Sequence, residues 1–274
     1  FKQKTAYEIR LSLVGSEMCI RDSPWLELVR GRNCWIYPSC NHWRTTEETR
    51  AWASLMYHRG AHGLNLFNYG HLLHGHDAQT PPQSHAQSTV WFSELHPDYY
   101  RVLHEIQDAR NLEFRDKRYV MESMPHTVGL EGNAGKAARD YRAINDIALP
   151  ITLKPGKHRV AFGFADDVHR AKQAGAPAHV TLRLKLTNYT APDEFDASVN
   201  GTLLAAAARR TRAVFIMNND TWVIYPIQAE QLRMGENTLE ITVTKLNPQM
   251  SETPVLSGME ILVAYNRGVS PRNG

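Results

Sequence analysis

The sequence is poor in cysteine, and this shortage argues against a disulfide-stabilised protein. Its 274 residues include three cysteines, and Cys34 and Cys40 lie in a stretch that we expect to be largely extended. Six extended residues span roughly 20 Å, whereas a disulfide needs Cα atoms closer than about 7 Å. We therefore predict that the two do not pair and are ordinary buried thiols, the alternatives being a metal pair or a reactive thiol.

Net charge and long apolar runs are also lacking. The formal net charge is +3, which is close to balance and gives no reason to expect a nucleic-acid partner. No run approaches the roughly 18 to 20 apolar residues of a membrane-spanning helix. We therefore expect no nucleic acid, no membrane span in this chain and no cofactor.

Residues 1–23 look like a translated sequencing-library adapter. Residues 2–9 read as the flow-cell primer and residues 13–22 as the transposon end. A secretory signal needs a longer apolar run and a small-residue cleavage site, so a native signal-like or amphipathic segment is the weaker alternative. We expect the native chain to begin near Pro24 with its own N-terminus missing, and any signal peptide with it.

The next part of the chain predicts two parallel strands. Residues 33–38 (NCWIYP) and 63–70 (GLNLFNYG) are short apolar runs bounded by polar residues, which is typical of buried parallel strands. A strand, a helix and a strand joined by short connections form a βαβ unit with a right-handed crossover. Because the pattern changes downstream, we expect residues 63–70 to be the last strand of their domain.

The helix between these strands has clear start and stop signals. Thr45 can cap its N-terminus, and Glu48 three positions later completes a capping box. Gly60 is a natural C-terminal stop. The residues that recur at helical spacing on its apolar face are Ala51, Trp52, Leu55 and Met56.

A polar loop and a second helix follow. The loop at 71–90 is rich in His, Gln and Ser, and a loop this long is usually functional or mobile. The spacing of His71, His74, His76 and Asp77 matches no standard metal site, so we expect solvated or substrate-contacting histidines and no metal. Apolar residues at helical spacing predict an amphipathic helix around residues 97–106. Residues 113–142 are expected to be a linker that includes a short strand at 118–121.

From residue 143 the apolar pattern changes to a period of two. The predicted strands are 143–149, 157–165, 179–189, 194–204, 211–217, 221–227, 237–246 and 259–265. Short alternating strands with turn signals between them predict a β-sandwich at 143–267, followed by a tail at 268–274. The insertion at 167–177 is polar and rich in alanine. The fold class is thus α/β plus all-β, in two domains.

Residues 24–112 resemble the last quarter of a bacterial glycoside-hydrolase-like (β/α)8 barrel. The residues that carry the likeness are 35–38 (WIYP), 51–53 (AWA) and 59–68 (RGAHGLNLFN). In such barrels a strand of the form G-A-x-G-x-x-x-F-N is often the eighth, and uncharacterised proteins similar to glycoside hydrolase family 10 are the group it most resembles. The resemblance implies a partial barrel at 24–112.

Residues 143–266 resemble a galactose-binding-like jelly roll. The likeness rests on 195–203 (FDASVNGTL), 225–227 (YPI) and 235–243 (GENTLEITV). Such domains accompany many glycosidases, where some bind sugars and many brace the catalytic domain. The exposed aromatic residues of a sugar-binding face could be Tyr189, Trp222 and Tyr225, although we expect these three in the core. Export to the periplasm or the medium follows only by analogy.

Barrel enzymes place their sites on the loops that follow the strands. The substrate-contact candidates are therefore Asn41, His42, Trp43, Asn68 and Tyr69. Aromatic rings offer flat apolar faces to a sugar, and amide and imidazole groups supply hydrogen bonds to hydroxyls. The alternative is that the two aromatic residues pack the barrel rim.

A complete catalytic site is not recognisable. Glycosidases normally use two carboxylates, which the resemblance places at the ends of the fourth and seventh strands. The expected seventh strand ends in Tyr37-Pro38-Ser39, which contains no carboxylate. The fourth strand is expected to lie before the start of this chain. Glu47 and Glu48 are explained as first-turn helix residues, which leaves Asp77 as the nearby loop carboxylate. We expect a parent protein that acts on or binds polysaccharide and an inactive fragment. A non-catalytic carbohydrate-binding or structural module on a degenerate barrel is the alternative.

Overall fold

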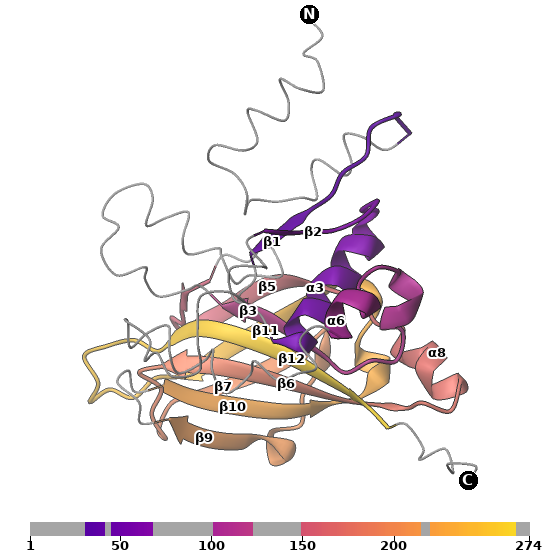
Figure 1. Cartoon of the computed structure of the whole chain (residues 1–274). Coiled ribbons are helices and arrows are strands. Elements are labelled where there is room, and N and C mark those ends of the chain that lie inside the picture. The colour runs from indigo at the N-terminus through magenta and orange to yellow at the C-terminus, as the bar shows by residue number, and fades with distance from the viewer. Residues whose placement is uncertain (1–30, 42–44, 68–100, 123–148, 215–219, 267–274) are drawn as a thin grey trace, which may run out of the picture.

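The computed structural model describes residues 31–41, 45–67, 101–122, 149–214 and 220–266 (Figure 1). These residues are mostly β-strands in two antiparallel sheets, with few helices. The strands are β1 (Ser39–Asn41), β2 (Asn65–Phe67), β3 (Lys117–Glu122), β4 (Ile151–Thr152), β5 (Gly156–Phe164), β6 (Ala178–Thr187), β7 (Glu194–Val199), β8 (Thr202–Leu203), β9 (Arg210–Val214), β10 (Asp220–Ile227), β11 (Gly235–Lys245) and β12 (Val255–Tyr265). The α-helices are α3 (Thr46–Arg59), α6 (Arg101–Glu105) and α8 (Val168–Gln173), and the 3-10 turns are η2 (Ala109–Leu112), η4 (Ala206–Ala208) and η5 (Ala229–Gln231).

The larger sheet has the order β3-β12-β6-β10-β9, with β4 also paired to β12, and the smaller sheet has the order β5-β11-β7-β8. Burial alternates along β6 and β11, as expected for strands with one buried face. The buried side chains of both sheets belong to one hydrophobic cluster. The period-of-two prediction is thus confirmed for the two antiparallel sheets.

Most predicted sandwich strands are present within a few residues of their expected bounds. The run predicted at 194–204 is two strands, β7 and β8, joined by a turn at Asn200 and Gly201 with φ angles of 50° and 82°. Asn and Gly tolerate this left-handed region better than other residues. Residues 143–148 and 215–217 of the predicted strands lie outside the described residues.

The predicted strand–helix–strand unit is also present. β1 and β2 pair in parallel, with Asn41 opposite Phe67, and α3 connects them. The capping box at Thr45 and Glu48 is formed, and Gly60 ends the helix with φ 101°. Within the described ranges, parallel pairing is confined to β1 and β2, so they do not form a closed barrel.

The first strand begins later than predicted. β1 starts at Ser39, whereas residues 33–37 are largely exposed, with Trp35 at 68% and Tyr37 at 50% exposure. Cys34 is exposed as well, so the prediction of a buried thiol is wrong for this residue. An apolar run forms a buried strand only where other residues cover it. No described residues cover the side chains of Trp35 and Tyr37 to this extent.

The segment at 113–142 contributes to the larger sheet. β3, predicted as a short strand within a linker, pairs antiparallel with β12 from Lys117 to Glu122. Helix α3 lies against β3, with α6 beside it (Figure 1). The insertion at 167–177 contains α8, which Asp167 caps by accepting a hydrogen bond from the Arg170 backbone N–H.

Candidate functional site

The C-terminal ends of β1 and β2 lie side by side. Because the strands are parallel and Asn41 is opposite Phe67, the chain leaves both strands at the same edge. Of the predicted contact residues, Asn41 is the last residue of β1, and the structure describes only its backbone. His42, Trp43, Asn68 and Tyr69 lie outside the described residues, directly after these two strand ends.

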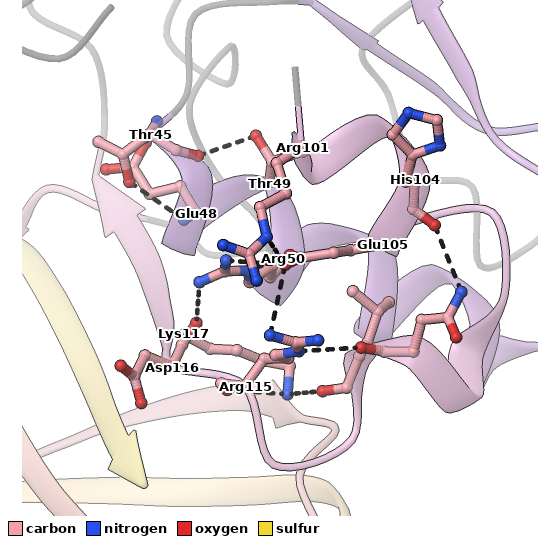
Figure 2. A network of polar contacts seen from close by, with 12 residues as sticks. Thr45, Glu48, Thr49, Arg50, Arg101, His104, Glu105, Arg115, Asp116 and Lys117 are labelled. Atoms are coloured by element: carbon pink, nitrogen blue, oxygen red, sulfur yellow. Dashed lines mark hydrogen bonds and ion pairs between the residues drawn. The ribbon is translucent and has the colours of Figure 1, made fainter. Parts of the chain in front are cut away.

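An arginine-rich network fixes the helices of this unit (Figure 2). Arg50 of α3 donates two hydrogen bonds to Glu105 of α6, at 2.6 and 3.2 Å. Arg115 lies 3.6 Å from the same carboxylate, and Arg50 also donates to the Asp116 carbonyl at 3.4 Å. Glu105 is 5% exposed, so its charge is compensated in place. The network joins α3 and α6 to the chain that enters β3.

Glu48 has a structural role. It accepts a bond from the Thr45 backbone N–H at 3.4 Å, and its other oxygen lies 3.4 Å from Arg118 of β3. Since Glu48 is 3% exposed, it is poorly placed to act on a substrate. The prediction that this residue belongs to the helix start is confirmed.

A row of charged and aromatic side chains continues from Glu48 across the outer face of the larger sheet. Arg118 binds Glu260 of β12 at 2.6 Å, and Glu260 lies 3.1 Å from Arg183 of β6. The Arg183 guanidinium sits 4.4 Å from the centre of the Trp222 ring on β10. The sequence interpretation missed this row, although arginine and lysine at outward positions of β6 were a signal for it.

The other sandwich aromatics are less available. Tyr225 is 2% exposed, as predicted for a core residue. Tyr189 is half-buried and packs edge-on against Phe195, with ring centres 5.7 Å apart. Trp222 is half-buried like Tyr189, but it lies on the outer face of the larger sheet beside Arg183.

A second polar cluster is buried beneath the junction of the helices and the sheets. Asp166 accepts hydrogen bonds of 2.6 Å from Lys117, Tyr119 and Tyr265. Burial, followed by the nearby Asp166 carboxylate, raises the pKa of Tyr119 and Tyr265 above the ordinary value. Such phenols stay protonated, so they donate to the carboxylate and are not bases at neutral pH.

A cleft of about 310 Å³ opens beside this cluster. It lies between α3 and η2 on one side and α8 on the other, and its walls include Tyr57, His58, Phe114 and Tyr265. Desolvation, assisted by Arg59, lowers the pKa of His58, which makes the neutral imidazole the prevailing form at pH 7. Tyr57, on the wall of the cleft, already donates to the Ile106 carbonyl at 2.7 Å.

No three His, Cys, Asp or Glu side chains of the described ranges gather as metal ligands. The predicted solvated residues His71, His74, His76 and Asp77 lie outside those ranges. No helix in the described part of the chain is long and apolar enough to cross a membrane.

Comparison with known proteins gives partial structural matches. No protein-family model and no curated protein matches the sequence. Two structures of BuGH86 with neoagarooctaose, one wild type and one variant, each match with a TM-score of 0.32 and 8% identity over 56% of this chain and 20% of theirs. BpGH86A, a β-porphyranase of glycoside hydrolase family 86 from the human gut bacterium Bacteroides plebeius, matches with a TM-score of 0.29 and 12% identity, over 56% of this chain and 21% of its own. The chain thus spans about a fifth of these proteins, and a likeness this low assigns no activity.

Proposed function

We propose that this chain is the C-terminal part of a glycoside-hydrolase-like protein that acts on or binds polysaccharide. In this proposal β1, α3 and β2 are the end of a (β/α)8 barrel of the family-10-like kind, and the two antiparallel sheets are a galactose-binding-like jelly roll. The observation that carries it is the parallel pairing of Asn41 with Phe67. Because of this pairing, the chain leaves β1 after Asn41 and β2 after Phe67 at the same edge of the two-stranded sheet. His42-Trp43 and Asn68-Tyr69 are the residues that follow.

The residue types at that edge suit a sugar. Tryptophan and tyrosine rings match the apolar faces of pyranose rings, while asparagine and histidine match hydroxyl groups. Loops at the carboxyl ends of barrel strands are the usual location of such contacts. The four residues outside the described ranges (His42, Trp43, Asn68 and Tyr69) are thus proposed as substrate contacts together with Asn41.

The chain alone is proposed to be inactive as a hydrolase. Glycoside hydrolysis needs a proton donor and a second carboxylate, and Glu48 is held by Thr45 and Arg118. This structural use of Glu48 favours the second candidate function, a non-catalytic carbohydrate-binding module. The two candidates differ in whether earlier strands of a longer protein supply a carboxylate pair.

The test is oligosaccharide binding by the full 274-residue chain. Isothermal titration with neutral oligosaccharides, including neoagarooctaose, should detect binding that Trp43→Ala and Asn68→Ala each weaken about tenfold. The matched control is Trp35→Ala, which removes an aromatic ring that is 68% exposed at the opposite end of the β1 segment. Absence of binding, or equal loss in all three variants, contradicts the proposal. Turnover of aryl glycosides by the chain contradicts the inactivity.

A further inference from the structure

The two sheets present outer faces of opposite charge balance. Among the described side chains of the larger sheet, the outward charged residues are Arg118, Arg183, Lys185, Arg210 and Arg212 against Asp220 and Glu260. On the smaller sheet they are Lys157, Arg159 and Lys245 against Glu194, Asp196, Glu236 and Glu240. Basic residues outnumber acidic ones on the first face, and the reverse holds on the second. A negatively charged partner would therefore favour the larger sheet.

The basic side chains form a regular pattern around two apolar ones. Trp222 of β10 lies opposite Arg212 of β9 on one side and Lys185 of β6 on the other. Two positions along, Ile224 lies between Arg210 and Arg183 in the same way. Residues opposite each other in antiparallel strands point to the same face. We name these six residues (Arg183, Lys185, Arg210, Arg212, Trp222 and Ile224) the basic face.

The two arginines of β9 are the available charges of the basic face. Arg183 pairs with Glu260 at 3.1 Å, and Lys185 pairs with Asp220 at 3.4 Å. Arg210 and Arg212 are exposed and form no ion pair with a carboxylate of the described residues. Being two positions apart on one strand, their Cα atoms are separated by about 7 Å.

We propose that the basic face binds a polysaccharide that carries carboxylates, that is, a chain of uronic acid residues. A guanidinium group presents a planar fork of donors that matches a carboxylate with two parallel hydrogen bonds. Arg210 and Arg212 would each take a carboxylate from successive parts of the sugar chain. The partly exposed Trp222, which lies opposite Arg212 and has the Arg183 guanidinium 4.4 Å from its ring centre, supplies an apolar surface beside them.

This occupant fits better than a nucleic acid. The net charge of the whole chain is only +3, and the Arg118, Arg183 and Lys185 charges are already paired with acidic residues. Two exposed guanidinium groups, one of them opposite the Trp222 ring, suit a short acidic oligosaccharide. The basic face is separate from the β1 and β2 ends, so the inference does not depend on the proposed function.

Isothermal titration at about 50 mM salt, where surface charges are weakly screened, tests the inference. The probes are an oligogalacturonate and its fully methyl-esterified form, which keeps the sugar rings and removes the charge. The acid should bind, and the ester should bind at least about tenfold more weakly. Arg210→Gln with Arg212→Gln should weaken binding of the acid about tenfold, and each single variant about threefold.

The control variant removes the same charge from the other sheet. Lys157→Gln with Arg159→Gln changes two exposed basic residues on β5 and should leave binding within about twofold of the wild type. Trp43→Ala, which tests the proposed function, should also leave it unchanged. Equal binding of acid and ester, no binding of the acid, no effect of the Arg210 and Arg212 variants, or equal binding of a short single-stranded DNA would each overturn the inference. Thermal unfolding of every variant verifies that it is folded.

Discussion

The Lys117 ammonium nitrogen lies 2.6 Å from a carboxylate oxygen of Asp166, and both side chains are almost fully buried, at 2% and 4% exposure. Lys117 donates as well to the carbonyls of Leu112 and Arg115. Asp166 accepts from the hydroxyls of Tyr119 and Tyr265. The pair thus joins the end of η2, the strands β3 and β12, and the segment after β5.

Replacing Asp166 by asparagine should destabilise the fold severely. The lysine would keep its charge in a buried place without a counter-charge, and breaking a buried pair costs about 3–5 kcal/mol. Urea unfolding followed by circular dichroism measures the loss. The matched control is Glu113→Gln, which breaks the exposed pair with Arg170 and should cost under about 1 kcal/mol.

A double variant separates charge from packing. Because removing both charges of a buried pair is often nearly neutral, Asp166→Asn combined with Lys117→Met should recover part of the lost stability. A double variant at least as unstable as Asp166→Asn alone would show that the uncompensated Lys117 charge is not the cause.

Stability should fall at high pH because of the phenols bound to Asp166. Burial, with the Asp166 charge, raises the pKa of Tyr119 and Tyr265 from the ordinary value of 10. The unfolded chain then loses phenol protons near pH 10 while the folded chain keeps them, so the contribution is complete below pH 10 and declines as pH rises above it. Each such group adds a slope of about 1.4 kcal/mol per pH unit.

The variant Tyr265→Phe isolates one of these groups. Urea unfolding between pH 9 and 11.5 should give, above pH 10, a decline that is shallower for this variant by about 1.4 kcal/mol per pH unit, from a lower starting stability. Parallel curves for variant and wild type would show that Tyr265 ionises equally in both states.

Local signals in the sequence predicted the local structure well. Burial alternates from residue to residue along β6 and β11. The helix signals Thr45, Glu48 and Gly60 likewise act within a few positions of one another. A short stretch of sequence is therefore enough to predict each of these features. The partners of Asp166 could not be found this way, because Lys117 and Tyr265 are distant in sequence and meet it only after the sheet forms.

The prediction that residues 33–38 form a buried strand is wrong for a related reason, since burial also depends on distant parts of the chain. The composition of residues 33–38 suits a covered strand, but Trp35 and Tyr37 are exposed in the described structure. Whether an apolar run is buried depends on the residues that pack over it, and the sequence of the run alone does not identify those residues. The structure shows the backbone pairing of Asn41 with Phe67, and the contact residues expected after these strand ends stay predictions, because their side chains lie outside the described residues.

The cap of α3 should matter for stability. The Thr45 hydroxyl accepts a hydrogen bond from the Glu48 backbone N–H at 3.2 Å, and α3 packs on β3. Thr45→Ala should cost about 1 kcal/mol, as for other N-caps, whereas Thr45→Ser keeps the oxygen and should cost only a few tenths of this. Urea unfolding at neutral pH compares the three proteins, and equal stability of the alanine variant would refute the role of the cap.

Asn237 is a fully buried amide whose bonding capacity is filled. Its side-chain oxygen accepts from the Asn200 amide at 2.8 Å and from the Arg233 backbone N–H at 3.0 Å. Its nitrogen donates to the carbonyls of Arg233 and Gly235, at 2.8 and 3.1 Å. The residue thereby connects the start of β11 to the turn after β7.

Substituting Asn237 by aspartate should be more harmful than its similar shape suggests. The new carboxylate oxygen would face two carbonyls with no proton to donate, and an unsatisfied buried group costs about 1–3 kcal/mol, more when charged. We expect a loss of about 3 kcal/mol in urea unfolding at pH 7, partly regained at pH 4, where the carboxyl is protonated in a larger fraction of molecules. The control Thr242→Ala alters an outward side chain of the same strand and should cost under about 1 kcal/mol. Equal losses in the two variants would mean that the bonds of Asn237 add nothing to the fold.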